Sequence, residues 1–330
     1  MPDNLRFCCV SGDRGPKVNS DNPDKKEVFL QLMNIRDKAL EGMKNHILPK
    51  ECEGCACYRE YDIDSPDTPK EITEKLNEKP LISYIIVNHF RQCDCFCIYC
   101  TLSRYHKKII TKSQKSDYYD LFPIIKQLYK EKLIDTQNLN VEFQGGSIGV
   151  LKEFPDLIKI FLKNGIKTMQ FFTNGIKYMP QIPDVSKKAG VILICSVDAG
   201  SRQTFKKIKL VDKFDDVIKN LKKYSEKSKN IEINAKYILQ EGLNDNKEEL
   251  SGFFDAVSSA KVHVAQLDLD FKKVMMNKGV RYDIPQHYYE LFDFFREQCS
   301  KHNLIPSVNS YIQQILDKGY FEWQQAVFNL

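Results

Sequence analysis

The chain contains 330 residues, of which 42% are hydrophobic and 11% aromatic, so it can form one large folded domain or two of ordinary size. Its formal net charge of +5 is small for this length and marks neither a strongly basic nor a strongly acidic protein. The most apolar segment, 81–87, is too short to cross a bilayer, and charges interrupt residues 1–20, so we expect a soluble, cytoplasmic protein with neither a membrane span nor a signal peptide.

Residues 1–79 form a polar region that we separate from the rest of the chain. Residues 26–45 carry apolar side chains at helical spacing and predict a helix, whereas the run 64–69 is typical of a linker. Cysteines also gather in this region. In the absence of a secretory signal, grouped thiols indicate metal or redox chemistry rather than disulfides. The two N-terminal groups are Cys8 with Cys9, and Cys52 with Cys55 and Cys57.

From residue 80 onward, short apolar runs alternate with longer amphipathic segments. The alternation predicts six strand–helix units in series, and therefore a parallel sheet joined by right-handed crossovers. Because a closed barrel has eight such units, we predict an α/β fold in the form of a partial (β/α)6 TIM-like barrel over 80–270, with a helical extension at 271–330. We expect strands near 81–88, 139–144, 167–173, 191–197, 231–239 and 262–269, and helices near 117–131, 154–164, 181–189, 213–228, 245–259 and 286–301.

The third cysteine group follows the first predicted strand. The group contains Cys93, Cys97 and Cys100, which are separated by three and then by two residues. They lie on one loop, where several sulfurs can converge on one site. Thiolates are the usual ligands of iron–sulfur clusters. A zinc knuckle is the alternative, because Cys95 offers a fourth sulfur and zinc binds four such ligands tetrahedrally.

This cysteine spacing, with the aromatic Tyr99 just before the last thiol, resembles the signature of the radical S-adenosylmethionine (SAM) superfamily. The resemblance implies that Cys93, Cys97 and Cys100 bind three irons of a [4Fe–4S] cluster. The fourth iron then takes the amino and carboxylate groups of SAM. Cleavage of SAM by the reduced cluster would yield a 5′-deoxyadenosyl radical that abstracts hydrogen from a substrate. Cys95 is then a bystander or a tuning group.

Later strand ends resemble the same superfamily and imply further SAM contacts. The sequence Gly145-Gly146-Ser147 resembles a Gly-Gly-Glu motif that holds the amino group of SAM, with Ser147 in place of the acid. Thr173 and Asn174, at the end of the third predicted strand, are expected at the same carboxyl end of the sheet. The resemblance also implies that Ser196 and Asp198 contact the ribose or the methionyl carboxylate, and we expect Tyr99 to be a cofactor-binding residue. Lys236 lies near the carboxyl end of the fifth predicted strand, where a basic residue can pair with that carboxylate.

The N-terminal cysteines resemble the auxiliary-cluster extensions called SPASM or Twitch domains. The resemblance implies a second iron–sulfur cluster, although such extensions normally follow the barrel rather than precede it. A structural zinc site made from the same thiols is the alternative, and a metal of either kind would explain how so polar a region folds. The expected ligands are Cys9, Cys52, Cys55 and Cys57.

The sequence leaves the substrate open. The leading hypothesis is an enzyme that acts on a peptide, a protein side chain, a sugar or a nucleotide, and draws electrons from a one-electron donor such as flavodoxin or ferredoxin. RNA modification is an alternative within this class, and a zinc-binding module without catalysis lies outside it. We interpret the lysine groups at 206–209 and 222–229 as solvated helix faces, although an RNA-binding stripe remains open. Cys195 and Cys299, outside the three groups, should be small buried residues.

Overall fold

A computed structural model describes residues 4–5, 18–19, 24–48, 65–66, 81–88, 90–100, 120–270, 285–308 and 313. Cys8, Cys9, Cys52, Cys55 and Cys57 lie outside these residues, and so does the predicted linker apart from 65–66. In the part of the chain that is described, no helix is long and apolar enough to cross a membrane.

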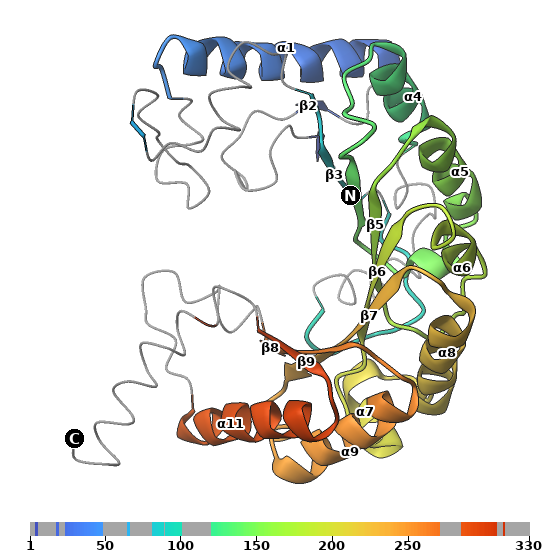
Figure 1. Ribbon diagram of the computed structural model, residues 1–330, viewed down its shortest axis with the longest axis vertical. Helices are drawn as coiled ribbons and strands as arrows, with labels where there is room; N and C mark the ends of the chain where they lie inside the picture. The colour runs from blue at the N-terminus through green and yellow to red at the C-terminus, as the bar shows by residue number, and fades with distance from the viewer. Residues whose placement is uncertain are drawn as a thin grey trace.

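Seven parallel strands form one curved sheet, and their order in the sheet follows their order in the chain. No pairing in the described ranges joins the two edge strands, so the sheet is an open, partial barrel (Figure 1). The strands are β3 (Tyr84–Val87), β4 (Asn140–Phe143), β5 (Thr168–Thr173), β6 (Gly190–Ser196), β7 (Ile231–Leu239), β8 (Val264–Leu269) and β9 (Ile305–Val308). A separate antiparallel pair joins β1 (Asn4–Leu5) to β2 (Val18–Asn19).

Most helices cover the convex side of the sheet, whereas the first helix runs across one end of it (Figure 1). The first one starts at the N-cap Asp24, whose carboxylate accepts the backbone N–H groups of Lys26 and Glu27 at 2.9 and 3.1 Å. The helices are α1 (Lys25–Lys44), α4 (Phe122–Lys130), α5 (Phe154–Asn164), α6 (Gln181–Val185), α7 (Arg202–Lys209), α8 (Phe214–Lys227), α9 (Lys247–Ser259) and α11 (Gln286–Lys301), with a short 3₁₀ turn, η3, at Ile148–Val150.

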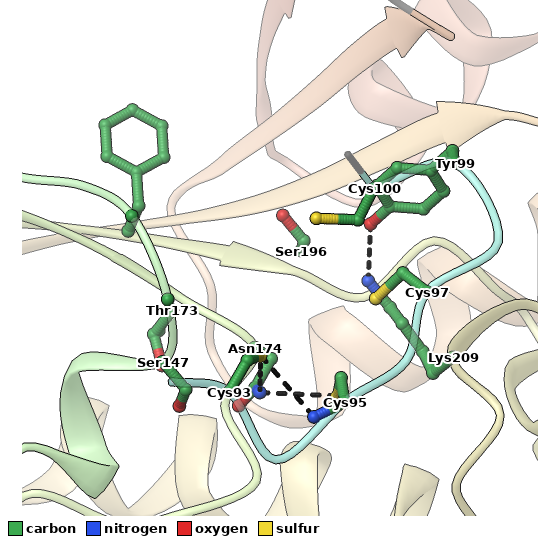
Figure 2. A pocket seen from close by; sticks show the side chains of 13 residues that line it. Cys93, Cys95, Cys97, Tyr99, Cys100, Ser147, Thr173, Asn174, Ser196 and Lys209 are labelled. Atoms are coloured by element: carbon green, nitrogen blue, oxygen red, sulfur yellow. Dashed lines mark hydrogen bonds between the residues drawn. The ribbon is translucent and has the colours of Figure 1, made fainter. Parts of the chain in front are cut away.

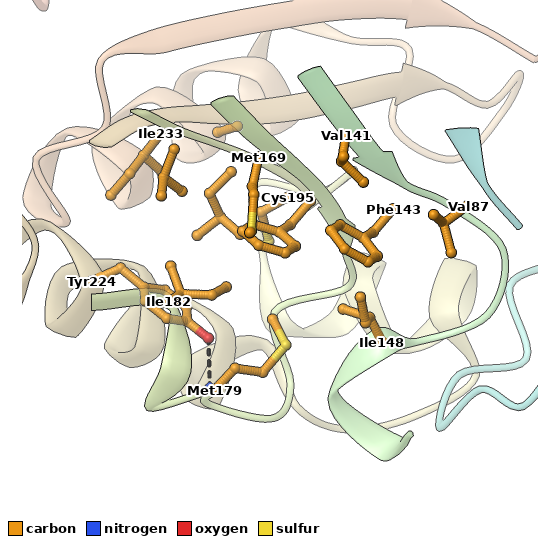
Figure 3. Close-up of a cluster of buried hydrophobic side chains, with 14 of the residues drawn as sticks. Val87, Val141, Phe143, Ile148, Met169, Met179, Ile182, Cys195, Tyr224 and Ile233 are labelled. Atoms are coloured by element: carbon orange, nitrogen blue, oxygen red, sulfur yellow. Dashed lines mark hydrogen bonds between the residues drawn. The ribbon is translucent and has the colours of Figure 1, made fainter. Parts of the chain in front are cut away.

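The core lies between the sheet and these helices (Figure 3). Alternate strand residues point into it, as the period of two in a strand requires. Phe143 of β4 stacks on Phe171 of β5 with ring centroids 5.1 Å apart, and Phe154 of α5 meets both rings edge-on. Cys195 and Cys299 are buried here, which confirms the prediction made for them.

The predicted fold class and the six predicted strands are confirmed, with three differences. A seventh strand, β9, extends the sheet into the segment expected to be only helical. The helix α7 lies between β6 and α8, where no separate helix was expected. The helix predicted over 181–189 ends earlier, because turns replace it from residue 186 onward. The division into regions at 79 and 270 stays a prediction.

Gly200 fixes how closely the end of β6 packs against α9. A Cβ at Gly200 would lie 1.8 Å from the carbonyl oxygen of Glu249. We predict that Gly200→Ala lowers the free energy of unfolding by about 3 kcal/mol, because backbone has to move to admit the methyl group. Urea denaturation measures this. Gly190→Ala is the control, since its Cβ meets Thr168 Oγ1 at 3.3 Å. Equal unfolding free energies for the two variants would contradict this packing.

Candidate active site

A small cavity lies at the carboxyl ends of β3 to β6, with a volume of about 170 Å³ (Figure 2). Parallel sheets present their functional groups at this end. All four thiols of the loop 90–100, which we call the cluster loop, border the cavity, and Cys95 and Cys97 are buried. The other residues around it that the sequence had singled out are Tyr99, Gly145, Gly146, Ser147, Thr173, Asn174 and Ser196.

The first half of the cluster loop is held by the Gly-Gly-Ser turn after β4. The N–H of Gly146 donates to the carbonyl of Phe90 at 3.2 Å, and that of Ser147 donates to the carbonyl of Gln92 at 2.8 Å. A Cβ at Gly146 would lie 1.9 Å from that Gln92 oxygen. Gly145 has a φ of 110°, which favours glycine. The two glycines therefore let the backbone approach the loop that carries the thiols.

The second half of the cluster loop is held by the end of α7. The N–H groups of Phe96 and Ile98 donate to the carbonyls of Lys209 and Ile208 at 3.1 and 3.0 Å. The last carbonyls of a helix have no partner within the helix, so these two bonds satisfy both the helix end and the loop. The thiols are therefore carried on a segment with backbone support on both sides.

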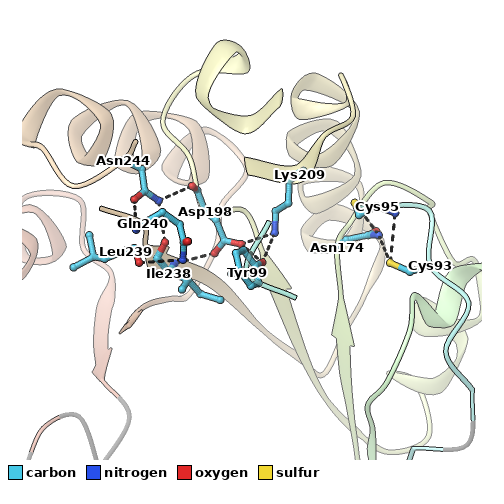
Figure 4. Close-up of polar contacts among 10 residues, drawn as sticks. All are labelled: Cys93, Cys95, Tyr99, Asn174, Asp198, Lys209, Ile238, Leu239, Gln240 and Asn244. Atoms are coloured by element: carbon cyan, nitrogen blue, oxygen red, sulfur yellow. Dashed lines mark hydrogen bonds and ion pairs between the residues drawn. The ribbon is translucent and has the colours of Figure 1, made fainter. Parts of the chain in front are cut away.

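A buried polar network backs the cluster loop (Figure 4). The Tyr99 hydroxyl donates to Asp198 Oδ2 at 2.6 Å, and the Ile238 N–H donates to Asp198 Oδ1 at 2.9 Å. Lys209 Nζ forms an ion pair with the same carboxylate and contacts the Tyr99 hydroxyl at 2.8 Å. Burial is the largest single effect and lowers the pKa of Lys209, but the charge and hydrogen bond of Asp198, together with the charge of Cys97, raise the pKa overall.

Three residues predicted to bind the cofactor have protein partners in this structure. Tyr99 borders the cavity, but its hydroxyl donates to Asp198. Asp198 is fully buried within the network and does not border the cavity. Lys236 forms an ion pair with Asp268 on the neighbouring strand, with 2.6 Å between Nζ and Oδ2. Ser196 does border the cavity, whereas the roles assigned to Asp198 and Lys236 stay predictions.

The thiols of the cluster loop differ in acidity. Contact with the Cys95 thiol is the largest cause that lowers the pKa of Cys93, and it also lowers that of Cys97, to about 6. The same contacts raise the pKa of Cys95, which therefore stays protonated. Asn174 Nδ2 donates to Cys95 Sγ at 3.3 Å and lies 3.7 Å from Cys93 Sγ. Since thiolates are the metal-binding form, Cys93 and Cys97 suit ligands and Cys95 suits a hydrogen-bond donor.

The thiols of the cluster loop supply the donor set of an iron–sulfur cluster, because thiolates are the usual protein ligands of its irons and each thiolate binds one iron. The buried Ser147 hydroxyl, which has no hydrogen-bond partner in the described part of the chain, adds a polar group on the cavity wall.

The interpretation of the lysine groups was wrong for Lys209, which borders the cavity and is 1% exposed. Its signal was present in the sequence, because Phe205, Ile208 and Lys209 lie on one side of a helix whose other lysines are solvent-facing. Lys206 and Lys207 are exposed as expected.

Comparisons with known proteins agree with this geometry. The chain resembles Streptococcus suis SuiB bound to SAM (TM-score 0.52) and SuiB bound to the precursor peptide SuiA (TM-score 0.51). Identity is 15% in both cases, over 89% of this chain and 69% of SuiB. A complex of anSMEcpe with AdoMet and a Cp18Cys peptide has a TM-score of 0.48 at 19% identity, over 69% of this chain and 63% of that one. No curated protein matches the sequence.

The family model that describes the radical SAM superfamily matches residues 87–254, about half of the chain. The matched segment begins at the end of β3, contains the cluster loop and the four strand ends around the cavity, and finishes within α9. The chain is therefore an enzyme of the radical SAM superfamily.

Proposed function

We propose that Cys93, Cys97 and Cys100 hold the SAM-cleaving [4Fe–4S] cluster of this enzyme. The observation that carries the proposal is one cavity, at the carboxyl ends of the strands, that these three thiols share with the Gly-Gly-Ser turn. When bound, such a cluster would supply one-electron reduction of SAM, and with it the 5′-deoxyadenosyl radical that takes a hydrogen atom from the substrate.

The residues of this chain prepare the site in three ways. The supports on both sides of the cluster loop keep the thiols in place and reduce the conformational entropy that binding has to remove. The carbonyls of Gly145 and Gly146 would accept hydrogen bonds from the amino group of SAM. The Ser196 hydroxyl would donate a hydrogen bond to the ribose or the carboxylate. The curved sheet and its strand ends shield the reacting atoms from water.

Ser147 completes the amino-group site in place of the acid. Ser147 borders the cavity and is 2% exposed, and its hydroxyl would accept a hydrogen bond from an N–H of the SAM amino group. Such a hydrogen bond contributes about 0.5–1.5 kcal/mol. We therefore expect Ser147→Ala to weaken SAM binding about tenfold, measured by calorimetry on the cluster-loaded protein. Ser147→Thr keeps the hydroxyl and is the control. Wild-type affinity in the alanine variant would remove Ser147 from the site.

We propose a peptide or a protein side chain as the first substrate class to test, ahead of a sugar or a nucleotide. SuiB, which shares this fold, has been crystallised with a precursor peptide. The lysines that would favour RNA lie elsewhere, since Lys222 and Lys223 belong to α8 on the convex side of the sheet. An RNA-modifying enzyme should bind RNA with an affinity that falls as salt concentration rises, with a slope set by the number of phosphate contacts. We expect no such dependence for this protein.

A second cluster and an external reductant complete the proposal. Cys9, Cys52, Cys55 and Cys57 would hold an auxiliary iron–sulfur cluster of the SPASM or Twitch kind. Iron and sulfide analysis of the reconstituted protein tests this. We expect more iron and sulfide per chain than one [4Fe–4S] cluster contains. The excess should be lost when Cys52 and Cys55 are replaced. Electrons would come from a small carrier such as flavodoxin or ferredoxin.

The test of the main proposal is anaerobic incubation of reconstituted protein with SAM and dithionite, followed by mass spectrometry. We expect brown protein and stoichiometric release of 5′-deoxyadenosine and methionine. A colourless, zinc-loaded protein that leaves SAM intact would defeat the proposal and favour a binding module.

A further inference from the structure

Lys209 is a buried cation at the cavity wall, and none of the roles above uses it. Its side chain is 1% exposed, yet it borders the same cavity as the thiols of the cluster loop (Figure 2). Removing an ammonium group from water costs several kcal/mol, so a buried lysine has to be compensated by charge and hydrogen bonds. A position with this cost, beside a redox site, calls for an electrostatic explanation.

The compensation comes from Asp198, which is also fully buried. The carboxylate accepts from the Tyr99 hydroxyl through Oδ2 and from the Ile238 N–H through Oδ1. Four parts of the molecule thus meet at one ion pair: the end of α7, the turn after β6, strand β7 and the cluster loop (Figure 4). Tyr99 lies between Cys97 and Cys100 in the sequence, so the pair also holds the segment that carries these two thiols.

The two charges differ in their relation to the cavity. Lys209 borders it, whereas Asp198 lies behind and does not. Coulomb energy falls with distance, so the group at the cavity wall acts more strongly on a charge inside the cavity. A cluster held by three thiolates becomes more negative when it takes up an electron, and nearby charge is one of the factors that set its reduction potential.

We propose that Lys209 is a positioning residue that also raises the reduction potential of the cluster held by Cys93, Cys97 and Cys100, with Asp198 as its opposing charge. The inference rests on the proposed function, because it requires the cluster. The pair makes reduction of the cluster easier and keeps the Tyr99 segment in place.

Opposite charge changes at the two positions test the proposal. Lys209→Met removes the cation and leaves Asp198 uncompensated, so the potential should fall. Asp198→Asn keeps one side-chain oxygen for the Ile238 N–H and places an amide N–H, which can donate to the Tyr99 hydroxyl, where Oδ2 was. It removes the anion, so the potential should rise. Lys207→Met is the control, because Lys207 is exposed on the same helix. A structural role alone would not move the two potentials in opposite directions.

The measurement is a redox titration of each reconstituted variant, followed by low-temperature EPR and accompanied by iron and sulfide analysis. We expect the reduction potentials of Lys209→Met and Asp198→Asn to shift in opposite directions. Each shift should change the equilibrium constant for reduction at least tenfold, which is 59 mV for one electron. If Lys209→Met loses iron, the double variant Lys209→Met/Asp198→Asn carries the test, and its potential should lie slightly below the wild type. Wild-type potentials in iron-loaded variants, or shifts of the same sign, would overturn the inference. Wild-type protein that takes up no cluster would instead defeat the proposed function.

Discussion

Replacing Cys93, Cys97 or Cys100 with alanine should abolish the release of 5′-deoxyadenosine, whereas Cys95→Ala should keep substantial activity. Each of the first three thiols would hold one iron of the cluster, so losing any of them leaves an iron without its ligand. The Cys95 thiol stays protonated and serves as a hydrogen-bond donor to its neighbours. Mass spectrometry of single-turnover reactions, together with iron analysis, measures the effect.

Cys95→Ser is the matched control for this series, since the serine hydroxyl keeps a donor at the same place. It should resemble the wild type more closely than Cys95→Ala. If Cys95→Ala were inactive while one of the other three variants stayed active, the ligand assignment would be wrong, although the membership of the superfamily would stand.

Gly146→Ala should prevent cluster loading without touching a thiol. The new Cβ would lie 1.9 Å from the Gln92 carbonyl oxygen, a distance that side-chain carbons do not reach, so the backbone just before Cys93 has to move. The move breaks the bonds from Gly146 and Ser147 to the cluster loop. We expect most of the cluster iron to be lost and the free energy of unfolding to fall by about 3 kcal/mol. Iron analysis and urea denaturation measure the two effects.

Gly149→Ala is the control for this substitution, three residues further along the chain. The three atoms nearest to its Cβ would be Lys177 Cβ at 3.2 Å, Met179 Cγ at 3.5 Å and the Lys177 carbonyl oxygen at 3.6 Å. This variant should load iron like the wild type. Full cluster content in Gly146→Ala would show that the Gly-Gly-Ser turn does not hold the loop.

The strands were predictable because short runs of β-branched and aromatic residues alternate with amphipathic segments along the chain. The exception, β9, contains Pro306 and exposed residues. A proline has no N–H group to donate to the neighbouring strand, so the local pattern does not favour a strand. Proline is tolerated here because β9 is an edge strand. Its place in the sheet comes from the pairing with β8, which no local pattern reveals.

The helix α7 shows why a charge pattern can mislead. Its mean composition is strongly polar, and three of its eight residues are lysines, which is typical of a solvated face. The partner that compensates the buried charge of Lys209 is Asp198, 11 residues earlier, in the turn after β6. An ion pair of this kind depends on the folded arrangement, so the sequence indicates its members but not their contact.

The site itself was partly predictable. The cysteine spacing and the strand-end motifs identify residues that the fold brings to one cavity. The sequence could not indicate that Asp198, just after β6, and Lys236, inside β7, would find protein partners. A charged residue at such a position can contact a ligand or form an ion pair, and the local sequence does not tell the two apart. Nor could it show that the two glycines meet the cluster loop, which follows a different strand.

The most direct test of the central claim is the EPR spectrum of the dithionite-reduced, reconstituted protein before and after the addition of SAM. A cluster held by only three thiolates has one open iron, so SAM should change the spectrum. The change should be absent in Cys97→Ala. A [4Fe–4S] spectrum that SAM leaves unchanged, or protein that carries zinc and no EPR signal, would contradict the assignment of Cys93, Cys97 and Cys100 to a SAM-cleaving cluster.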